Sequence, residues 1–147
     1  MSTFYNKPSG PTQLMNRFMS ILASMGIGPK KMATLEVRGR KTGEPRSVAV
    51  NISEHEGQRY LVAPRGETEW VRNVRAAGGE AVIRRGKSDR VKLEELPAAE
   101  RAPIIQTYLR QNAWVTKREF GIEPDAPLED FQRIAPDHPV FRIVENP

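Results

Sequence analysis

Residues 37–50 (Val37–Val50) read "VRGRKTGEPRSVAV" and separate two segments in which apolar and polar side chains alternate. The alternating apolar residues are Ala33, Leu35 and Val37 before this stretch, and Val48, Val50 and Ile52 after it. A period of two is typical of half-buried β-strands, and the glycines at positions 39 and 43 permit a turn between them. We therefore predict a β-hairpin whose tip carries the sequence "GRKTGEP".

The tip of this hairpin is strongly basic, because Arg38, Arg40, Lys41 and Arg46 follow one another closely. Like charges repel, so the cluster indicates either a solvated tip that deters pairing between sheet edges or a binding site for an anion. Strand alternation turns Arg38 toward solvent. From this motif alone the solvated tip is the simpler interpretation.

The composition indicates a single globular domain with an anionic partner. The chain of 147 residues has 38% hydrophobic side chains, enough for one core. It has no cysteine, which excludes a disulfide framework and a thiolate nucleophile. The net charge of +5 is typical of proteins that bind nucleic acid, a membrane surface or a phosphorylated small molecule. Without a long apolar run or a signal-peptide core, we expect a cytoplasmic protein.

The rest of the pattern predicts an α+β fold: about six mostly antiparallel strands form a small barrel with flanking helices, in one domain over residues 1–147. Further strands are expected at residues 59–64 ("RYLVAP"), 80–96 (a hairpin turning near Gly86 and Asp89) and 140–144 ("VFRIV"). Helices are expected at residues 11–25 (amphipathic), 68–78 (with Thr68 as its cap), from Pro97 through Leu109, and 128–135.

A second motif, "PRGETEW" (Pro64–Trp70), lies where the third strand gives way to a helix. The N-terminus of a helix favours anions, and Arg65 with Gly66 again combines a cation with a permissive backbone. Trp70 offers a flat apolar wall or packs in the core, and Asn73 lies about one helical turn further on. This motif favours ligand binding over a merely solvated hairpin.

Together, "GRKTGEPR" and "YLVAPRGETEWVRNVRAAGG" resemble the deazaflavin-dependent nitroreductase family, the branch of the flavin/deazaflavin oxidoreductases that uses coenzyme F-420. The C-terminal "HPVFRIV" is similar to the closing strand of that family. The resemblance implies a split β-barrel and a reduced deazaflavin that delivers a hydride to a quinone, an activated alkene or enone, or a nitroaromatic compound. Arg65 stands where the nitroimidazole-activating members carry a lysine, so F-420 use is better supported than nitroimidazole reduction.

Carried over position by position, the resemblance implies ten cofactor-binding residues. The cations that would hold the phosphate and the nearby tail are Arg40, Lys41 and Arg46. The residues along the deazaflavin ring would be Pro64, Arg65 and Gly66. The pocket would be closed by Trp70 and Asn73 from the helix, and by the apolar Val48 and Ala49.

The catalytic proton donor is not identified by the sequence. Tyr60 and Tyr108 are candidates on their chemistry alone, and core packing with a hydrogen-bonded hydroxyl is the better explanation of both. His55 and His138 lack the spacing of metal ligands, so we expect surface or capping roles and no metal site.

Two other functions remain open. The barrel could bind FMN in place of F-420, or the chain could be a non-catalytic basic module that binds nucleic acid or an anionic ligand through the hairpin over residues 80–96. Residues 112–139 form either a loop-rich lid or a connector. The helix over residues 11–25 either packs on the core or contacts a membrane surface, and the protein is a monomer or a homodimer.

Overall fold

The structure of the protein is a computed structural model in which residues 32–112 and 120–145 are described. The strands are β1 (Met32–Arg38), β2 (Pro45–His55), β3 (Gln58–Val62), β4 (Glu80–Arg85), β5 (Lys87–Glu95) and β6 (Val140–Glu145). The helices are α2 (Glu69–Ala76), α3 (Ala102–Gln111) and α5 (Leu128–Ile134), with 3-10 turns η1 (Ala98–Glu100) and η2 (Ala135–Asp137). The expected helix over residues 11–25 lies outside the described residues.

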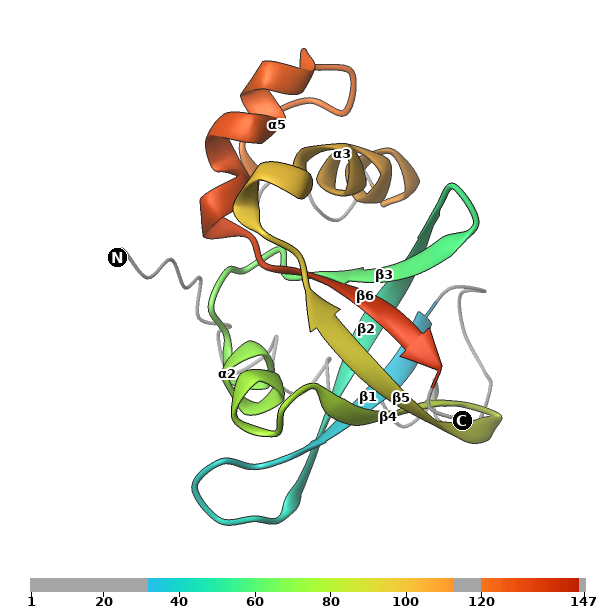
Figure 1. The fold of residues 1–147 in the computed structure, drawn as a ribbon. Coiled ribbons are helices and arrows are strands. Elements are labelled where there is room, and N and C mark those ends of the chain that lie inside the picture. Colours follow the sequence, from blue (N-terminus) through green and yellow to red (C-terminus); the bar gives the residue numbers. More distant parts are fainter. Residues whose placement is uncertain (1–31, 113–119, 146–147) are drawn as a thin grey trace, which may run out of the picture.

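The six strands close into a barrel in the order β1-β2-β3-β6-β5-β4 (Figure 1), and every neighbouring pair is antiparallel. Closure leaves none of these strands as a sheet edge that could pair with another chain. The prediction of an α+β fold built on a split β-barrel is confirmed.

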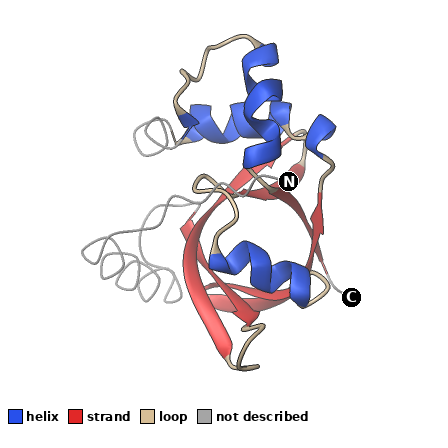
Figure 2. Cartoon of the chain, turned by 90° about the vertical axis from the view of Figure 1, so that its left-hand side faces the viewer, coloured by secondary structure: helices blue, strands red, loops and turns tan. Residues whose placement is uncertain are grey.

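Alternating side chains fill the inside of the barrel, as the period of two in each strand predicts. Figure 2 shows α2 lying across one opening of the barrel, where its buried Val71 and Val74 join the interior. The buried cluster comprises Ala33, Leu35, Val37, Leu61, Ala63, Val71, Val74, Ile83, Val91, Leu93, Phe141 and Ile143. The barrel therefore has one end closed by a helix that follows directly from the "PRGETEW" motif.

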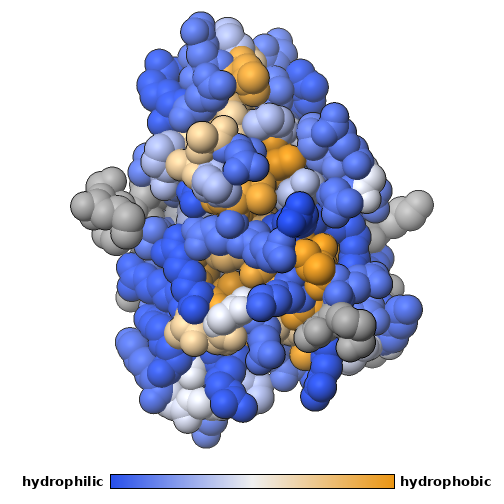
Figure 3. Space-filling model, viewed as in Figure 1, coloured by the Kyte–Doolittle hydropathy of each residue, from blue (hydrophilic) through white to orange (hydrophobic). Residues whose placement is uncertain are grey.

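A second apolar cluster lies between the barrel and the helices α3 and α5, which sit together on the side of β3 and β6 (Figure 1). Its buried members are Tyr60, Val62, Ala102, Ile104, Ile105, Tyr108, Leu109, Phe120, Phe131, Ala135 and Val140. The face seen in Figure 3 is largely hydrophilic, with apolar atoms in small separate groups. Within residues 32–112 and 120–145, no helix is long and apolar enough to cross a membrane.

The helix expected to open at Pro97 begins instead at Ala102. Pro103 lacks the N–H that a helix running from Pro97 would need at that position, so residues 98–100 form a 3-10 turn. Pro103 itself occupies the first turn of α3, where the missing N–H has no cost. The short helix predicted over residues 128–135 is confirmed as α5.

Thr68 occupies the N-cap position of α2 as expected, but its side chain makes no capping hydrogen bond. Its Oγ1 atom is buried and has no hydrogen-bond partner among the residues that the structure describes. A buried hydroxyl without a hydrogen-bond partner lowers the stability of the folded state, so Thr68 is a candidate for contact with a ligand.

Two adjacent glycines offer a test of how closely the backbone after α2 approaches β5. A Cβ atom at Gly79 would lie 2.4 Å from the carbonyl oxygen of Leu93, whereas one at Gly78 would meet nothing within 4 Å. Both residues have positive φ, at +88° and +66°. We expect Gly79→Ala to lower the free energy of unfolding by about 3 kcal/mol and Gly78→Ala by about 1 kcal/mol, in urea denaturation. Equal losses would contradict this account.

Candidate functional site

The basic hairpin tip is a compact turn held by backbone hydrogen bonds. The N–H of Gly39 donates to the carbonyl of Glu44 at 2.7 Å, and the N–H of Gly43 donates to the carbonyl of Gly39 at 2.9 Å. Gly43 has a φ of +76°, which favours glycine. The turn leaves the side chains of Lys41 and Arg46 exposed.

Arg40 connects the hairpin tip to α2. The Oδ1 atom of Asn73 accepts hydrogen bonds from both the backbone N–H of Arg40 at 3.1 Å and its Nη1 at 2.8 Å. The same Nη1 donates to Oε2 of Glu69 at 2.8 Å. Glu69 and Asn73 are one turn apart on α2, so both reach Arg40 from the same helical face. This set, which we call the Arg40 clamp, fixes the hairpin tip against α2.

Asn73 contributes the rigid part of the Arg40 clamp. Its side chain is buried, only 5% of the residue being exposed, and one oxygen serves two donors. Figure 1 shows why the contact can form: the hairpin of β1 and β2 extends past the barrel beneath α2. Two predicted site residues that are 33 positions apart are thereby brought together.

Glu69 carries a carboxylate surrounded by positive charge. Its pKa is lowered, chiefly by the hydrogen bond from Arg40, and further by the charges of Arg40, Lys41 and Arg72, against a smaller opposing effect of burial. Glu69 is therefore ionised at neutral pH. Neither Glu69 nor Arg72 was identified from the sequence. A signal for Glu69 was present, because it lies four residues before Asn73 and therefore beside it on the helix.

The loop between β3 and α2 forms the second part of the candidate site. Gly66 adopts a φ of +85°, its N–H donates to the carbonyl of Ala63, and its own carbonyl accepts from the N–H of Thr68. On the other side, the N–H of Ala63 donates to the carbonyl of Pro139 at 2.9 Å. Pro64 and Arg65 are half-buried. The loop leads directly into α2, and so into the Arg40 clamp.

His138 supports this loop from behind. We expected a surface or capping role, but the residue is buried, because its ring packs against Phe120 with 4.4 Å between ring centroids. Its Nδ1 lies 3.0 Å from the carbonyl oxygen of Ala63, which can only accept, so Nδ1 carries the proton and donates. The prediction of a surface or capping role is therefore wrong. His138 is a buried residue that supports the backbone just before the "PRGETEW" motif.

The other candidate residues divide between the two clusters. Trp70 is half-buried and packs against the barrel interior, with its ring centroid 5.7 Å from that of Phe141. Val48 also packs against the interior, whereas Ala49 follows it in β2 and points to the opposite face. Tyr60 and Tyr108 belong to the buried layer beneath α3 and α5. In that layer the Tyr108 ring makes an edge contact with Phe120.

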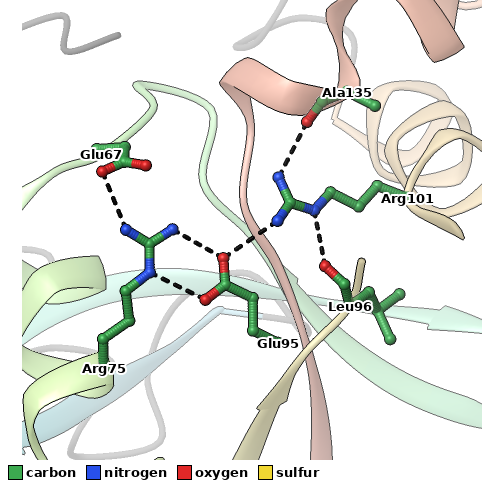
Figure 4. Close-up of polar contacts among 6 residues, drawn as sticks. All are labelled: Glu67, Arg75, Glu95, Leu96, Arg101 and Ala135. Atoms are coloured by element: carbon green, nitrogen blue, oxygen red, sulfur yellow. Dashed lines mark hydrogen bonds and ion pairs between the residues drawn. The ribbon is translucent and has the colours of Figure 1, made fainter. Parts of the chain in front are cut away.

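An ion network ties α2 to the helical layer (Figure 4). Arg75 of α2 donates to both carboxylate oxygens of Glu95 at 2.9 and 2.7 Å and to Glu67 at 2.9 Å. The network continues from Glu95 to Arg101, which also donates to the carbonyls of Leu96 and Ala135. The pKa of Arg75 is raised, first by its hydrogen bond with Glu95, whereas burial lowers that of Arg101. The loop between β3 and α2 is thus held at both ends. Ala63 holds its beginning through His138 and Pro139, and Glu67 holds its end through Arg75.

Removal of the Asn73 amide tests the Arg40 clamp. We expect Asn73→Ala to lower the free energy of unfolding by about 1–2 kcal/mol, because the backbone N–H and guanidinium of Arg40 both lose an acceptor. Hydrogen exchange of the Arg40 amide should accelerate. The control is Thr42→Ala, which removes only an exposed hydrogen bond to Glu44 and should cost less than about 0.5 kcal/mol. Equal effects of the two substitutions would show that the clamp does not hold the tip.

Comparison with known proteins adds to this geometry. The family described as "F420H(2)-dependent quinone reductase" matches residues 15–128, and no curated protein matches the sequence. A solved structure described as an "F420-H2 Dependent Reductase (FDR-A)" is 21% identical, with 79% of this chain and 95% of that chain covered and a TM-score of 0.49. One described as a domain-swapped dimer is 21% identical, with 90% and 95% covered and a TM-score of 0.51. A protein of unknown function from Agrobacterium tumefaciens str. C58 is 16% identical, with 99% and 60% covered and a TM-score of 0.54.

The last two similarities show a shared fold. The family match covers well over half of the chain, including both the basic hairpin and the "PRGETEW" loop. It confirms the resemblance to the F-420-dependent branch of the flavin/deazaflavin oxidoreductases. The chain therefore belongs to the F-420H2-dependent quinone reductase family.

Proposed function

We propose that this protein binds reduced coenzyme F-420, which supplies a hydride when bound, and that it directs this hydride to an electron-poor organic acceptor. A quinone is the first candidate, ahead of an activated alkene or a nitroaromatic compound. The observation that carries the proposal is the Arg40 clamp, which holds a basic hairpin tip against the helix that follows the Pro64–Thr68 loop.

The residues of the site fit such a cofactor. Its phosphodiester and glutamate tail are anionic, and Lys41 and Arg46 offer exposed cations next to Arg40. The positive φ of Gly66 allows the tight turn of this loop, and the half-buried Pro64 and Arg65 before it offer a surface for a flat ring. Within residues 32–112 and 120–145, the buried Oγ1 of Thr68 in the same loop has no hydrogen-bond partner, and a ligand would supply one.

Each residue has a distinct role in this proposal. Lys41 and Arg46 bind the phosphate and tail, while Asn73 orients Arg40 rather than contacting the ligand itself. Pro64, Arg65 and Gly66 line the ring, and Trp70 closes the barrel side of the pocket. The Ala63 and Glu67 hydrogen bonds keep this loop in one conformation, which lowers the entropy cost of binding.

The structure offers less support for a nucleic-acid module on the hairpin of β4 and β5. Arg84 pairs with Glu36 at 2.6 Å, Arg85 donates to the carbonyl of Met32, and Glu80 lies opposite Lys92 in the sheet. Glu36 and Glu80 thus offset part of the positive charge that a nucleic acid would need on this hairpin. FMN binding in the same barrel is the second candidate, and it is an outcome of the following test.

Binding titrations test the cofactor. We expect micromolar binding of F-420, followed by fluorescence, and weaker binding of FMN. The double substitution Lys41→Ala with Arg46→Ala should weaken F-420 binding at least about tenfold, or about 1.4 kcal/mol, without unfolding the protein. Arg40 is left unchanged because it also holds α2.

The matched control is Lys87→Ala with Arg90→Ala, which removes the same two kinds of cation from the other hairpin and should leave binding unchanged. Equal weakening in both pairs would show that only net charge matters. Tighter binding of FMN than of F-420 would overturn the proposed cofactor. With F-420H2 bound, a soluble quinone should be reduced faster than an enone or a nitroaromatic compound at the same concentration.

A further inference from the structure

The carboxylate of Glu69 lies on α2 against the basic tip, where it accepts a hydrogen bond from Nη1 of Arg40 at 2.8 Å. Its side chain is 57% exposed, so a ligand in solution can reach it. The Asn73 part of the Arg40 clamp is independent of it, because Asn73 binds both the backbone and the guanidinium of Arg40. Glu69 therefore places a negative charge beside Arg40, although Asn73 already attaches the hairpin tip to α2.

The charges around Glu69 come from two elements. Arg40 and Lys41 belong to the hairpin and Arg72 to α2, and all three lower the pKa of the Glu69 carboxyl, the hydrogen bond from Arg40 most of all. An anionic ligand bound to these cations must either displace the carboxylate from Arg40 or bind beside it. In both cases the negative charge of Glu69 remains close to the bound ligand.

We propose that Glu69 is a specificity-determining residue, which weakens the binding of a phosphate monoester, with nearly two negative charges, more than that of a phosphodiester with one, and so shifts the selectivity of the basic tip toward the phosphodiester. This inference rests on the proposed function, because it takes the phosphate of the cofactor to bind at the tip. It goes further by assigning the discrimination between F-420 and FMN to a single residue.

The reason is the dependence of charge repulsion on the charge of the ligand. A phosphate monoester carries about −1.5 to −2 at neutral pH, and the energy of repulsion by Glu69 is proportional to that charge. The repulsion is therefore up to about twice as large for FMN as for the phosphodiester of F-420. Glu69 and Asn73 together occupy Nη1 of Arg40, so a phosphate that binds Arg40 through its Nε and Nη2 edge has the Glu69 carboxylate on the same guanidinium.

Glu69→Gln removes the charge and keeps an oxygen that can accept from Arg40. We expect it to strengthen FMN binding about tenfold, which is about 1.4 kcal/mol, and F-420 binding by about threefold or less. Glu69→Asp should retain most of the wild-type preference. The control is Glu129→Gln, since Glu129 is also an exposed glutamate in the first turn of a helix, and it should change neither affinity.

A second readout does not depend on either flavin. Inorganic phosphate and dimethyl phosphate are titrated while the Nε–Hε resonance of Arg40 is followed by NMR. Glu69→Gln should strengthen the response to inorganic phosphate more than the response to dimethyl phosphate. Equal gains for the two probes, or no gain for inorganic phosphate, would overturn the inference, as would equal gains for FMN and F-420.

These outcomes separate the inference from the proposed function. If the wild-type protein binds no F-420 while Glu69→Gln gains affinity selectively for inorganic phosphate at Arg40, the proposed function is wrong and the role of Glu69 stands. If F-420 binds and the substitution changes no preference, the reverse holds. Thermal unfolding of each variant checks that the fold is retained.

Discussion

Closure of the barrel between β1 and β4 is the constraint on which the candidate site depends. The two strands pair only over residues 34–36 of β1, whereas β1 and β2 remain paired as far as Arg38 and Pro45. The end of this hairpin therefore projects beyond the closed barrel, and closure aims it at the opening that α2 covers (Figure 1). A hairpin in an open sheet would have no such neighbour. The position of the basic tip thus follows from barrel topology, and its chemistry from the tip sequence.

The Arg40 clamp turns that position into a defined geometry. Cations concentrated in a short turn repel one another, and exposed ones remain solvated with many conformations. The amide oxygen of Asn73 removes this freedom at Arg40, because it accepts from the backbone and the side chain together. Lys41 follows directly after a fixed residue, so its side chain starts from a fixed point. A neutral amide suits this purpose, since it adds no charge to the binding site.

Much of the fold could be predicted from the sequence, because alternation and glycine turns are local signals. The six strands and α5 belong to this class, as does the exposure of Arg38. The pairing of Arg40 with Asn73 and Glu69 could not be predicted. Sequence spacing shows that Glu69 and Asn73 share a helix face, but it does not show which segment that face contacts. The burial of His138 was missed for the same reason: a histidine between aspartate and proline looks exposed until Phe120 packs against it. The site residues stay predictions even where the structure brings them together.

The two halves of the candidate site are built for different tasks. The Pro64–Thr68 loop is held at one end by Ala63 through His138 and Pro139, and at the other by Glu67 through Arg75. Arg75 in turn shares Glu95 with Arg101, so this support reaches the layer of α3 and α5 (Figure 4). In the proposed function this loop is the wall for the cofactor ring, because hydride transfer demands close alignment of the reacting atoms. The proposed task of the hairpin tip is to supply charge, and exposed charge is adjustable by single residues. On this proposal, ligand preference at the tip can evolve without disturbing the geometry of the reaction.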